Sequence, residues 1–364
     1  MTSVAQKNRT IDPPQPPSKT PHAVRWRFKT LLVSLALGLL ISELVARALG
    51  WGYAVRTFPI VGDPVVHHWQ PRNLSVTVRD VGGQYGPFET HFNSDGLAMR
   101  SELPPAGTPS VIFLGDSYTL GIEVHEAHRF VTRVGDRLGL PALNLGCPSF
   151  CPLLSRLVLE RFEDRVTPRA VVLMLYNNDV ADESRWRATA RKNRDGRIVG
   201  VPGDAHTLWR RLCERSAVAR LALFAREAWR VSRTRDLPTH RLMHDAPWLP
   251  AVTSPIRPHP SDPSWLNIRE SILDIRQICA QKDATLFLCA VPDRGALRSS
   301  IPDYFSDYVG QIARECEIEF IDLPAAFRGH DPQKLYYPVD IHFTEEGHRI
   351  AAEAIAESLA PAIK

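Results

Sequence analysis

The chain has 364 residues, of which 44% are hydrophobic and 23% are charged, a composition typical of a globular protein. The formal net charge is +4, but residues 1–29 carry six Lys or Arg and one Asp, a net of +5, so the remainder carries about −1 (+4 minus +5). A near-neutral remainder excludes a basic face for nucleic acid, and we expect no nucleic-acid partner.

The N-terminal segment is basic and rich in proline, which predicts a disordered tail over residues 1–29. It leads into Leu31–Ile41, an apolar run whose only polar residue is Ser34. A membrane span needs about 20 residues, and the run reaches that length when it is extended on both sides. We therefore predict a transmembrane anchor over residues 30–50.

Positive charge before the span predicts a cytoplasmic N-terminus and an extracytoplasmic remainder, attached to the cell membrane by a single pass. Glu43 and Arg47 lie four residues apart within the span, a spacing that lets them pair on one helix face. Two alternatives stay open. The Ala-Arg-Ala run at 46–48 resembles a signal-peptidase site, and a buried core helix is also apolar, although it does not explain the cationic flank.

Residues 51–109 are poor in strand patterns and predict an irregular lead-in. Strand-like runs then alternate with amphipathic stretches. The predicted strands are Val111–Leu114, Ala142–Leu145, Ala170–Tyr176, Thr285–Val291 and Glu319–Leu323. The predicted helices are Arg129–Leu138, Leu153–Arg165, Leu266–Ala280, Tyr304–Cys316 and Glu345–Leu359. This alternation predicts an α/β domain over residues 110–364, with a central parallel sheet covered by helices on both faces.

Residues 184–262 interrupt this rhythm and are rich in Arg and Trp. Within them, Thr207–Val231 is amphipathic with a basic polar face, and a proline-rich spacer, Pro247–Pro263, follows. We interpret residues 184–262 as a cap inserted over the rim of the sheet. The alternative is a pair of helices docked on the surface with solvated arginines.

The six cysteines fit no zinc spacing, and nothing in the sequence indicates a metal or an organic cofactor. An extracytoplasmic location would allow a local disulfide between Cys147 and Cys151. Cys279 and Cys289 fall in a helical and a strand-like stretch, so we expect them to be buried free thiols.

Two short motifs carry chemistry. The predicted strand that begins at Val111 ends in Gly-Asp-Ser at 115–117, and Asp-Ile-His follows at 340–342. Gly-Asp-Ser after a strand is also typical of an ordinary strand-to-helix turn, with Asp116 or Ser117 as the helix N-cap. A serine hydroxyl becomes a nucleophile only when a base removes its proton, and that base needs an orienting carboxylate. The pair of motifs therefore predicts acyl transfer through a serine.

The order of four blocks resembles the SGNH (GDSL-like) hydrolase superfamily over about residues 110–360. The blocks are Gly-Asp-Ser, Asn-Leu-Gly at 144–146, Asn-Asp at 178–179 and Asp-x-His, each after a predicted strand. Residues 93–100 also look like the segment that precedes this domain in bacterial membrane-anchored members. The resemblance implies a three-layer α/β/α flavodoxin-like fold. Tyr176 stands where the third block commonly has Gly. Asn177 is an alternative to Asn178 as the asparagine of this block.

Residue by residue, the resemblance implies that Ser117 is the nucleophile, His342 the base and Asp340 the residue that orients it. The oxyanion would be met by the backbone N–H groups of Ser117 and Gly146 and by the side-chain amide of Asn178. Each such donor is typically worth about 3 kcal/mol. With His342 as base, the rate should rise with pH between about 6 and 7.

Other polar residues near these motifs have structural interpretations. Asp116 is predicted to brace the turn, and His348 is predicted to lie on a helix surface. His125 and His128 fall in the turn and helix start after Ser117. Any of the three histidines would be placed to touch substrate if the loops bring it to the rim.

The resemblance implies a serine esterase or O-acyltransferase acting on an ester, in particular an acetyl ester, of an extracytoplasmic carbohydrate or similar small molecule. Water and a sugar hydroxyl as acceptor require the same residues, so the sequence does not choose between them. The alternative is a catalytically silent envelope or polysaccharide-binding protein on the same fold, which would not need Ser117, Asn178, Asp340 and His342 together.

Overall fold

The computed structural model describes residues 21–48, 60–78, 84–98, 101–203, 216–219, 221–222, 261–298, 302–338 and 340–363. The chain divides into two compact units, residues 1–50 and residues 51–364. The predicted amphipathic stretch at 207–231 and the proline-rich spacer lie almost entirely outside the described residues.

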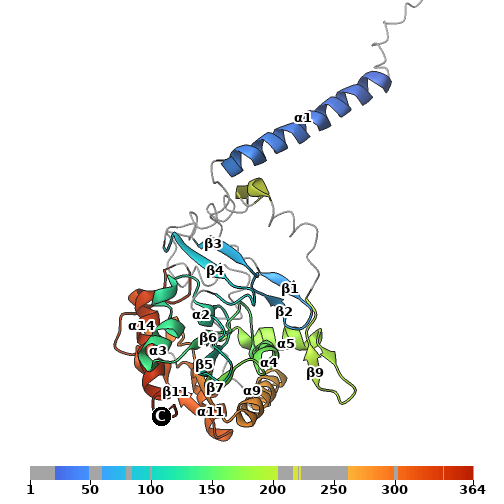
Figure 1. The fold of residues 1–364 in the computed structure, drawn as a ribbon. Coiled ribbons are helices and arrows are strands. Elements are labelled where there is room, and N and C mark those ends of the chain that lie inside the picture. Colours follow the sequence, from blue (N-terminus) through green and yellow to red (C-terminus); the bar gives the residue numbers. More distant parts are fainter. Residues whose placement is uncertain are drawn as a thin grey trace, which may run out of the picture. The chain divides into compact units, whose positions relative to one another are not determined.

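The first unit contains one long helix, α1 (Pro21–Ala48). Its segment Lys29–Ala48 has a mean hydropathy of 1.9 and is long and apolar enough to cross a membrane (Figure 1). Residues 21–29 were expected in a disordered tail, but they belong to the helix, which starts at a proline, a residue favoured in the first helical turn. Arg47 Nε donates to Glu43 Oε1 at 2.7 Å, which confirms the predicted pair.

A five-stranded parallel sheet forms the centre of the second unit, in the order β11-β10-β7-β5-β6 (Figure 1). Its strands are β5 (Pro109–Leu114), β6 (Ala142–Asn144), β7 (Thr167–Leu175), β10 (Thr285–Ala290) and β11 (Glu319–Ile321). Numbered along the chain, this order is 2-1-3-4-5, the flavodoxin-like arrangement. The predicted fold class is therefore confirmed.

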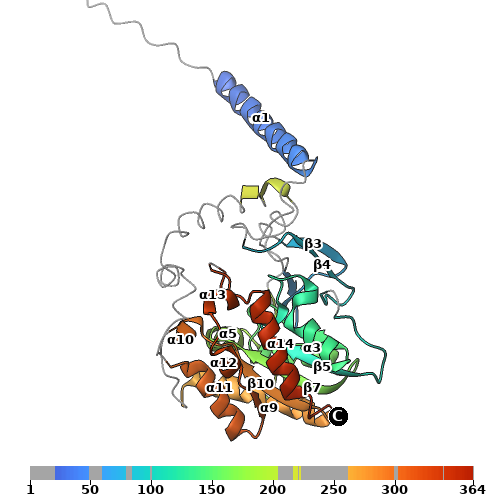
Figure 2. The same ribbon diagram turned by 90° about the vertical axis from the view of Figure 1, so that its left-hand side faces the viewer.

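Helices cover both faces of the sheet, as two views at right angles show (Figures 1 and 2). One face carries α3 (Phe130–Leu138), α12 (Leu323–Phe327) and α14 (Glu345–Leu359), and the other carries α4 (Pro152–Phe162), α9 (Pro263–Gln281) and α11 (Tyr304–Glu315). Side chains of β5 alternate between them: Val111 packs toward the first face and Ile112 toward the second. Burial on both faces explains the uninterrupted apolar runs in the sequence.

The lead-in is not irregular, contrary to the prediction for residues 51–109. It forms two antiparallel hairpins, β1 (Val61–Asp63) with β2 (His67–Trp69) and β3 (Leu74–Val78) with β4 (Phe88–Phe92). Strands of three to five residues give too short an alternation to be recognised with confidence from sequence. The side chain of Trp69 is buried in the main core.

The start of the predicted cap is part of the core domain. Helix α5 (Asp179–Ala188) crosses the expected boundary at residue 184, and the hairpin of β8 (Arg191–Lys192) and β9 (Ile198–Gly200) follows. Val201 N donates to Val65 O at 2.6 Å, which ties this segment to the lead-in. A cap, as predicted, would therefore begin only after these residues.

The cysteines in the described part of the chain are free thiols. Cys147 and Cys151 are both free and buried, so the expected local disulfide is wrong. Burial raises the pKa of both thiols well above the ordinary range, which keeps them protonated and unreactive. Cys279 and Cys289 are buried free thiols, as predicted.

His348 is buried inside α14 and not on a helix surface, so its predicted position is wrong. Its Nδ1 accepts a hydrogen bond from Phe130 N at 3.2 Å, and its ring stacks on that of Phe130. Burial is the main cause that lowers the pKa of His348 from 6.5 to about 3. Because only the unfolded state binds this proton between these values, His348 makes the fold less stable as pH falls from 6.5 toward 3.

Replacing His348 with Ala should destabilise the fold by about 2–4 kcal/mol, since it opens a cavity and leaves the Phe130 N–H without its acceptor. Urea unfolding measures this. The exposed His330→Ala serves as the control and should stay within about 0.5 kcal/mol of the wild type. Equal stability of the two variants would show that the buried contacts of His348 do not matter.

Candidate active site

The nucleophile turn follows directly from the end of β5. Gly115 has φ +142°, and a Cβ at this position would lie 2.4 Å from Thr119 Oγ1 and 2.6 Å from Met174 O, so only glycine fits. Asp116 caps the short helix α2 (Ser117–Leu120) by accepting from Tyr118 N at 2.9 Å. This confirms that Asp116 braces the turn. Ser117 is thereby held at the first position of α2, on the carboxyl edge of the sheet.

The structure brings together the three residues predicted to be catalytic. His342 Nε2 lies 2.7 Å from Ser117 Oγ, and His342 Nδ1 lies 2.5 Å from Asp340 Oδ1. The contact with a carboxylate requires Nδ1 to carry a proton, so Nε2 can accept the proton of the Ser117 hydroxyl. This is the geometry that a base-activated serine needs.

Asp340 is fixed by groups on either side of it. Its Oδ2 accepts from the Tyr85 hydroxyl at 3.1 Å, and its backbone N–H donates to Gln84 Oε1 at 3.3 Å. Its Oδ1 also accepts from the backbone N–H of His342 at 3.1 Å. The lead-in thus supplies two residues that orient the acid of the triad, a role the sequence did not indicate.

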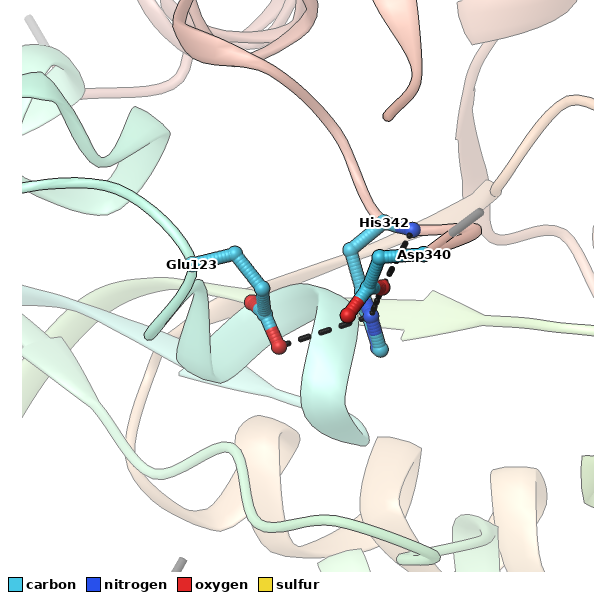
Figure 3. Close-up of side chains that lie close together, drawn as sticks. All are labelled: Glu123, Asp340 and His342. Carbon is cyan, nitrogen blue, oxygen red and sulfur yellow. Dashed lines mark hydrogen bonds and ion pairs between the residues drawn. The ribbon is translucent and has the colours of Figure 1, made fainter. Parts of the chain in front are cut away.

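A second carboxylate, which the sequence analysis missed, faces the same histidine. Glu123 Oε1 lies 3.4 Å from His342 Nδ1, and the Glu123 side chain is only 7% exposed. Figure 3 shows the side chains of Glu123 and Asp340 both turned toward the ring of His342. Glu123 lies just after Gly121, the residue that ends α2. This closeness in sequence to the nucleophile is the signal by which Glu123 could have been found.

The three carboxylates near His342 determine its charge. Burial of the ring disfavours the cation, but the charges of Glu123 and Asp340, the hydrogen bond to Asp340 and the charge of Asp116 outweigh it and raise the pKa of His342 from 6.5 to about 9. The rise of the rate is therefore expected above the range of pH 6 to 7 that the sequence predicted. A neutral base, and hence activity, is expected on the alkaline side.

Three further acids, Asp116, Asp179 and Asp182, lie near one another, the first two buried and Asp182 half-buried. Burial raises the pKa of Asp116 to about 7 and that of Asp182 to about 6. The pKa of Asp179 is also raised, mainly by burial and then by the charge of Asp116. Part of this group is therefore uncharged at neutral pH, which lowers the repulsion that an oxyanion beside Ser117 would meet.

The predicted oxyanion donors differ in how they are placed. Asn178 lies at the N-cap of α5, and its Nδ2 donates one N–H to Asp182 Oδ2 at 2.9 Å. This bond fixes the amide and uses one of its two N–H donors, so the second can point to an oxyanion. The Gly146 N–H donates to Asn144 Oδ1 at 3.0 Å. In this structure the N–H is therefore paired within its own loop, and the role of Gly146 as an oxyanion donor stays a prediction.

Gly146 also has a packing function. A Cβ at Gly146 would lie 2.7 Å from Leu120 N and from Thr119 Cβ, so glycine is needed for the loop to approach α2. Its carbonyl accepts from Gln70 Nε2 at 2.6 Å, which links the loop to the lead-in.

His125 and His128 do not contact the triad. His125 is exposed and accepts from Ala127 N, and His128 Nδ1 lies 2.7 Å from Glu345 Oε2. These contacts are structural, and neither histidine competes with His342 as the base.

Ligand atoms of Glu123, Asp340 and His342 lie within 4.8 Å of one another, a spacing that a divalent cation would also accept. A cation on His342 Nδ1 would have to displace the proton that Asp340 accepts, and Nε2 already faces Ser117. We therefore assign the cluster to acid–base chemistry.

An open groove of about 920 Å³ borders this cluster on the side of Glu123. Aromatic side chains of Tyr85, Phe88 and Tyr337 contribute to its wall, together with polar ones such as Gln84 and Lys334. A mixture of aromatic faces and hydrogen-bonding groups suits a polar ligand that also has apolar surface.

The sequence matches the GDSL-like Lipase/Acylhydrolase family over residues 113–350, a range that includes the nucleophile and the histidine. This chain belongs to that family. The order of motifs, the flavodoxin-like sheet and the Ser117–His342–Asp340 contacts all agree with the match. No curated protein matches the chain.

Solved structures of similar fold include the lipase/acylhydrolase from Enterococcus faecalis, with 14% identity, a TM-score of 0.37, and coverage of 70% of this chain and 97% of that one. A GDSL-like lipase from Bacteroides thetaiotaomicron has 15% identity and a TM-score of 0.36, covering 72% and 92%. A catalytic mutant of Axe2, an acetylxylan esterase from Geobacillus stearothermophilus, has 16% identity and a TM-score of 0.37, covering 71% and 96%. Likenesses this distant carry no information about substrate.

Proposed function

We propose that this family member is a serine esterase that cleaves oxygen esters through an acyl-serine intermediate. The observation that carries the proposal is the continuous chain of contacts from Ser117 Oγ to His342 Nε2 and from His342 Nδ1 to Asp340. A catalytically silent binding protein would not need to keep a serine, a base and an orienting acid in hydrogen-bond order.

The chemistry follows from these contacts. Ser117 Oγ attacks the acyl carbon while its proton moves to His342 Nε2, and Asp340 stabilises the imidazolium. The backbone N–H of Ser117 and the Asn178 amide are the donors for the oxyanion. The tetrahedral intermediate collapses when the alcohol leaves with the proton from Nε2, and water then releases the acid from Ser117 by the same steps.

For the substrate we propose an acetyl ester of a carbohydrate or a similar polar molecule. The groove lined by Glu123 supports this, because it combines the rings of Tyr85, Phe88 and Tyr337 with amide and charged groups. Sugar rings offer both apolar faces and hydroxyls to such a surface. A sugar hydroxyl in place of water would make the reaction an acyl transfer with the same residues.

The test of the proposed function is the release of acetate from acetylated polysaccharide by the purified full chain in detergent, with Ser117→Ala as the control. Acetate release that depends on Ser117 supports the esterase. Labelled acetyl groups that appear on an added sugar instead of in water would identify acyl transfer.

We further propose that α1 anchors the protein in the cell membrane and that the hydrolase domain lies outside the cytoplasm. The apolar segment Lys29–Ala48 and the basic flank before it support this orientation. A C-terminal alkaline phosphatase fusion, which folds only outside the cytoplasm, should be active in cells. An inactive but well-expressed fusion would place the domain in the cytoplasm.

A further inference from the structure

We propose that Glu123 is a second carboxylate partner of the catalytic His342, and that it sets the pH at which the enzyme becomes active. The proposal rests on the proposed function, since it assigns a positioning and electrostatic role within that reaction. Its basis is the 3.4 Å distance between Glu123 Oε1 and His342 Nδ1 in a buried setting.

Tyr337 fixes this distance by bonding to both loops. Its backbone N–H donates to the carbonyl of His342 at 3.0 Å, and its hydroxyl donates to the carbonyl of Glu123 at 3.1 Å. Val124 packs with Tyr85 and Tyr337 in one small buried cluster. The glutamate is therefore held beside the histidine by the fold.

The same loop is tied down at its start. Arg129 Nε donates to the carbonyl of Gly121 at 3.0 Å, and Arg129 Nη2 donates to Thr90 Oγ1 of the lead-in at 2.7 Å. The positive charge of Arg129 also interacts with Glu123, which favours the ionised carboxylate.

Asp340 and Glu123 have different roles because they lie at different distances from His342 Nδ1. Asp340 at 2.5 Å accepts the Nδ1 proton, whereas Glu123 at 3.4 Å acts mainly through its charge. A negative charge this close favours the imidazolium in the transition state, but it also keeps His342 protonated in the resting enzyme at neutral pH. Glu123 therefore lowers the activity at neutral pH and makes His342 a stronger base at alkaline pH.

Titratable or charged groups from each neighbouring element surround the ring and Glu123: Asp116, Ser117, Tyr118, Arg129, Asp340 and His348. Asp116 and Asp340 act in the same direction as Glu123. Tyr118 stays neutral because burial raises its pKa above the ordinary range. Loss of the Glu123 charge would make Asp116 easier to ionise. The added charge of Asp116 would partly replace that of Glu123, so the fall in the pKa of His342 should be moderate.

The decisive experiment compares kcat/KM for p-nitrophenyl acetate against pH in the full chain and in Glu123→Gln. We expect the ascending limb to move down by about one pH unit, so that the variant is several-fold faster at pH 7 and slower on the alkaline plateau. Glu123→Asp, which keeps the charge on a shorter arm, should give an intermediate limb and covers the case that Glu123→Gln fails to fold.

Glu353→Gln is the matched control, because it removes one carboxylate whose partners are Arg137 and Arg349 and not the triad. Its limb should coincide with that of the wild type. A uniform loss of rate in Glu123→Gln without any movement of the limb would mean a structural role only and would overturn the proposal.

A measurement without turnover separates this proposal from the esterase itself. An NMR titration of ¹³C-labelled histidine in the full chain, with the His342 signal assigned by its loss in His342→Ala, should show a lower His342 pKa in Glu123→Gln. An unchanged His342 pKa refutes the role of Glu123 even if the protein is an esterase. Absence of any Ser117-dependent turnover would instead refute the proposed function alone.

Discussion

Ser117→Ala should reduce the turnover of p-nitrophenyl acetate by about 10⁶-fold, because among the described residues Ser117 supplies the hydroxyl that lies at His342 Nε2. Stability should change by less than about 1 kcal/mol, since Ser117 occupies the first position of α2, where alanine is well tolerated, and Asp116 still caps the helix. The rate and the midpoint of thermal unfolding are the two measurements.

Ser117→Thr is a useful companion variant, because it keeps a hydroxyl but adds a methyl group in a crowded turn. It should also lose most activity. If Ser117→Ala retained most of the wild-type rate, the acyl-serine mechanism would be refuted, whatever the fold.

The second large effect is expected at the base and its orienting acid. His342→Ala should cost about as much as Ser117→Ala, because members of a triad act as a unit. Asp340→Asn should cost less, at most about 10⁴-fold, since Glu123 remains 3.4 Å from Nδ1 and can still favour the protonated ring. Wild-type activity should rise with pH through the pKa of about 9 at His342. Steady-state kinetics from pH 6 to 10 measure all three effects.

The half-buried His128 provides a contrast to His342. His128→Ala should be nearly neutral for the rate because its contact is with Glu345. Loss of activity in His128→Ala with retention in His342→Ala would mean that the catalytic histidine has been misassigned.

Much of the fold was predictable because a sheet buried on both faces produces long apolar runs, and these ended where the strands end. Ser117 and His342 were recognisable since each lies beside a distinctive short motif after a strand or before a helix. The short hairpins of the lead-in, such as β1 and β2, carried too few residues for a period to appear.

Two features of the site depend on contacts between distant segments. Glu123 became part of the site only because Tyr337 bonds to its carbonyl and to that of His342. Tyr85 reaches Asp340 across more than two hundred residues of sequence. The hydrogen bond from the Gly146 N–H to Asn144 is local, but no sequence pattern distinguishes this N–H from one that faces a substrate.

Covalent labelling tests the central claim most directly. The purified full chain is incubated with a fluorophosphonate that reacts with activated serines, and the modified peptide is mapped by mass spectrometry. We predict a single label on Ser117, formed faster as pH rises toward 9 and absent in His342→Ala. A label on another serine, or ester turnover by a protein whose Ser117 remains unlabelled, would contradict the account.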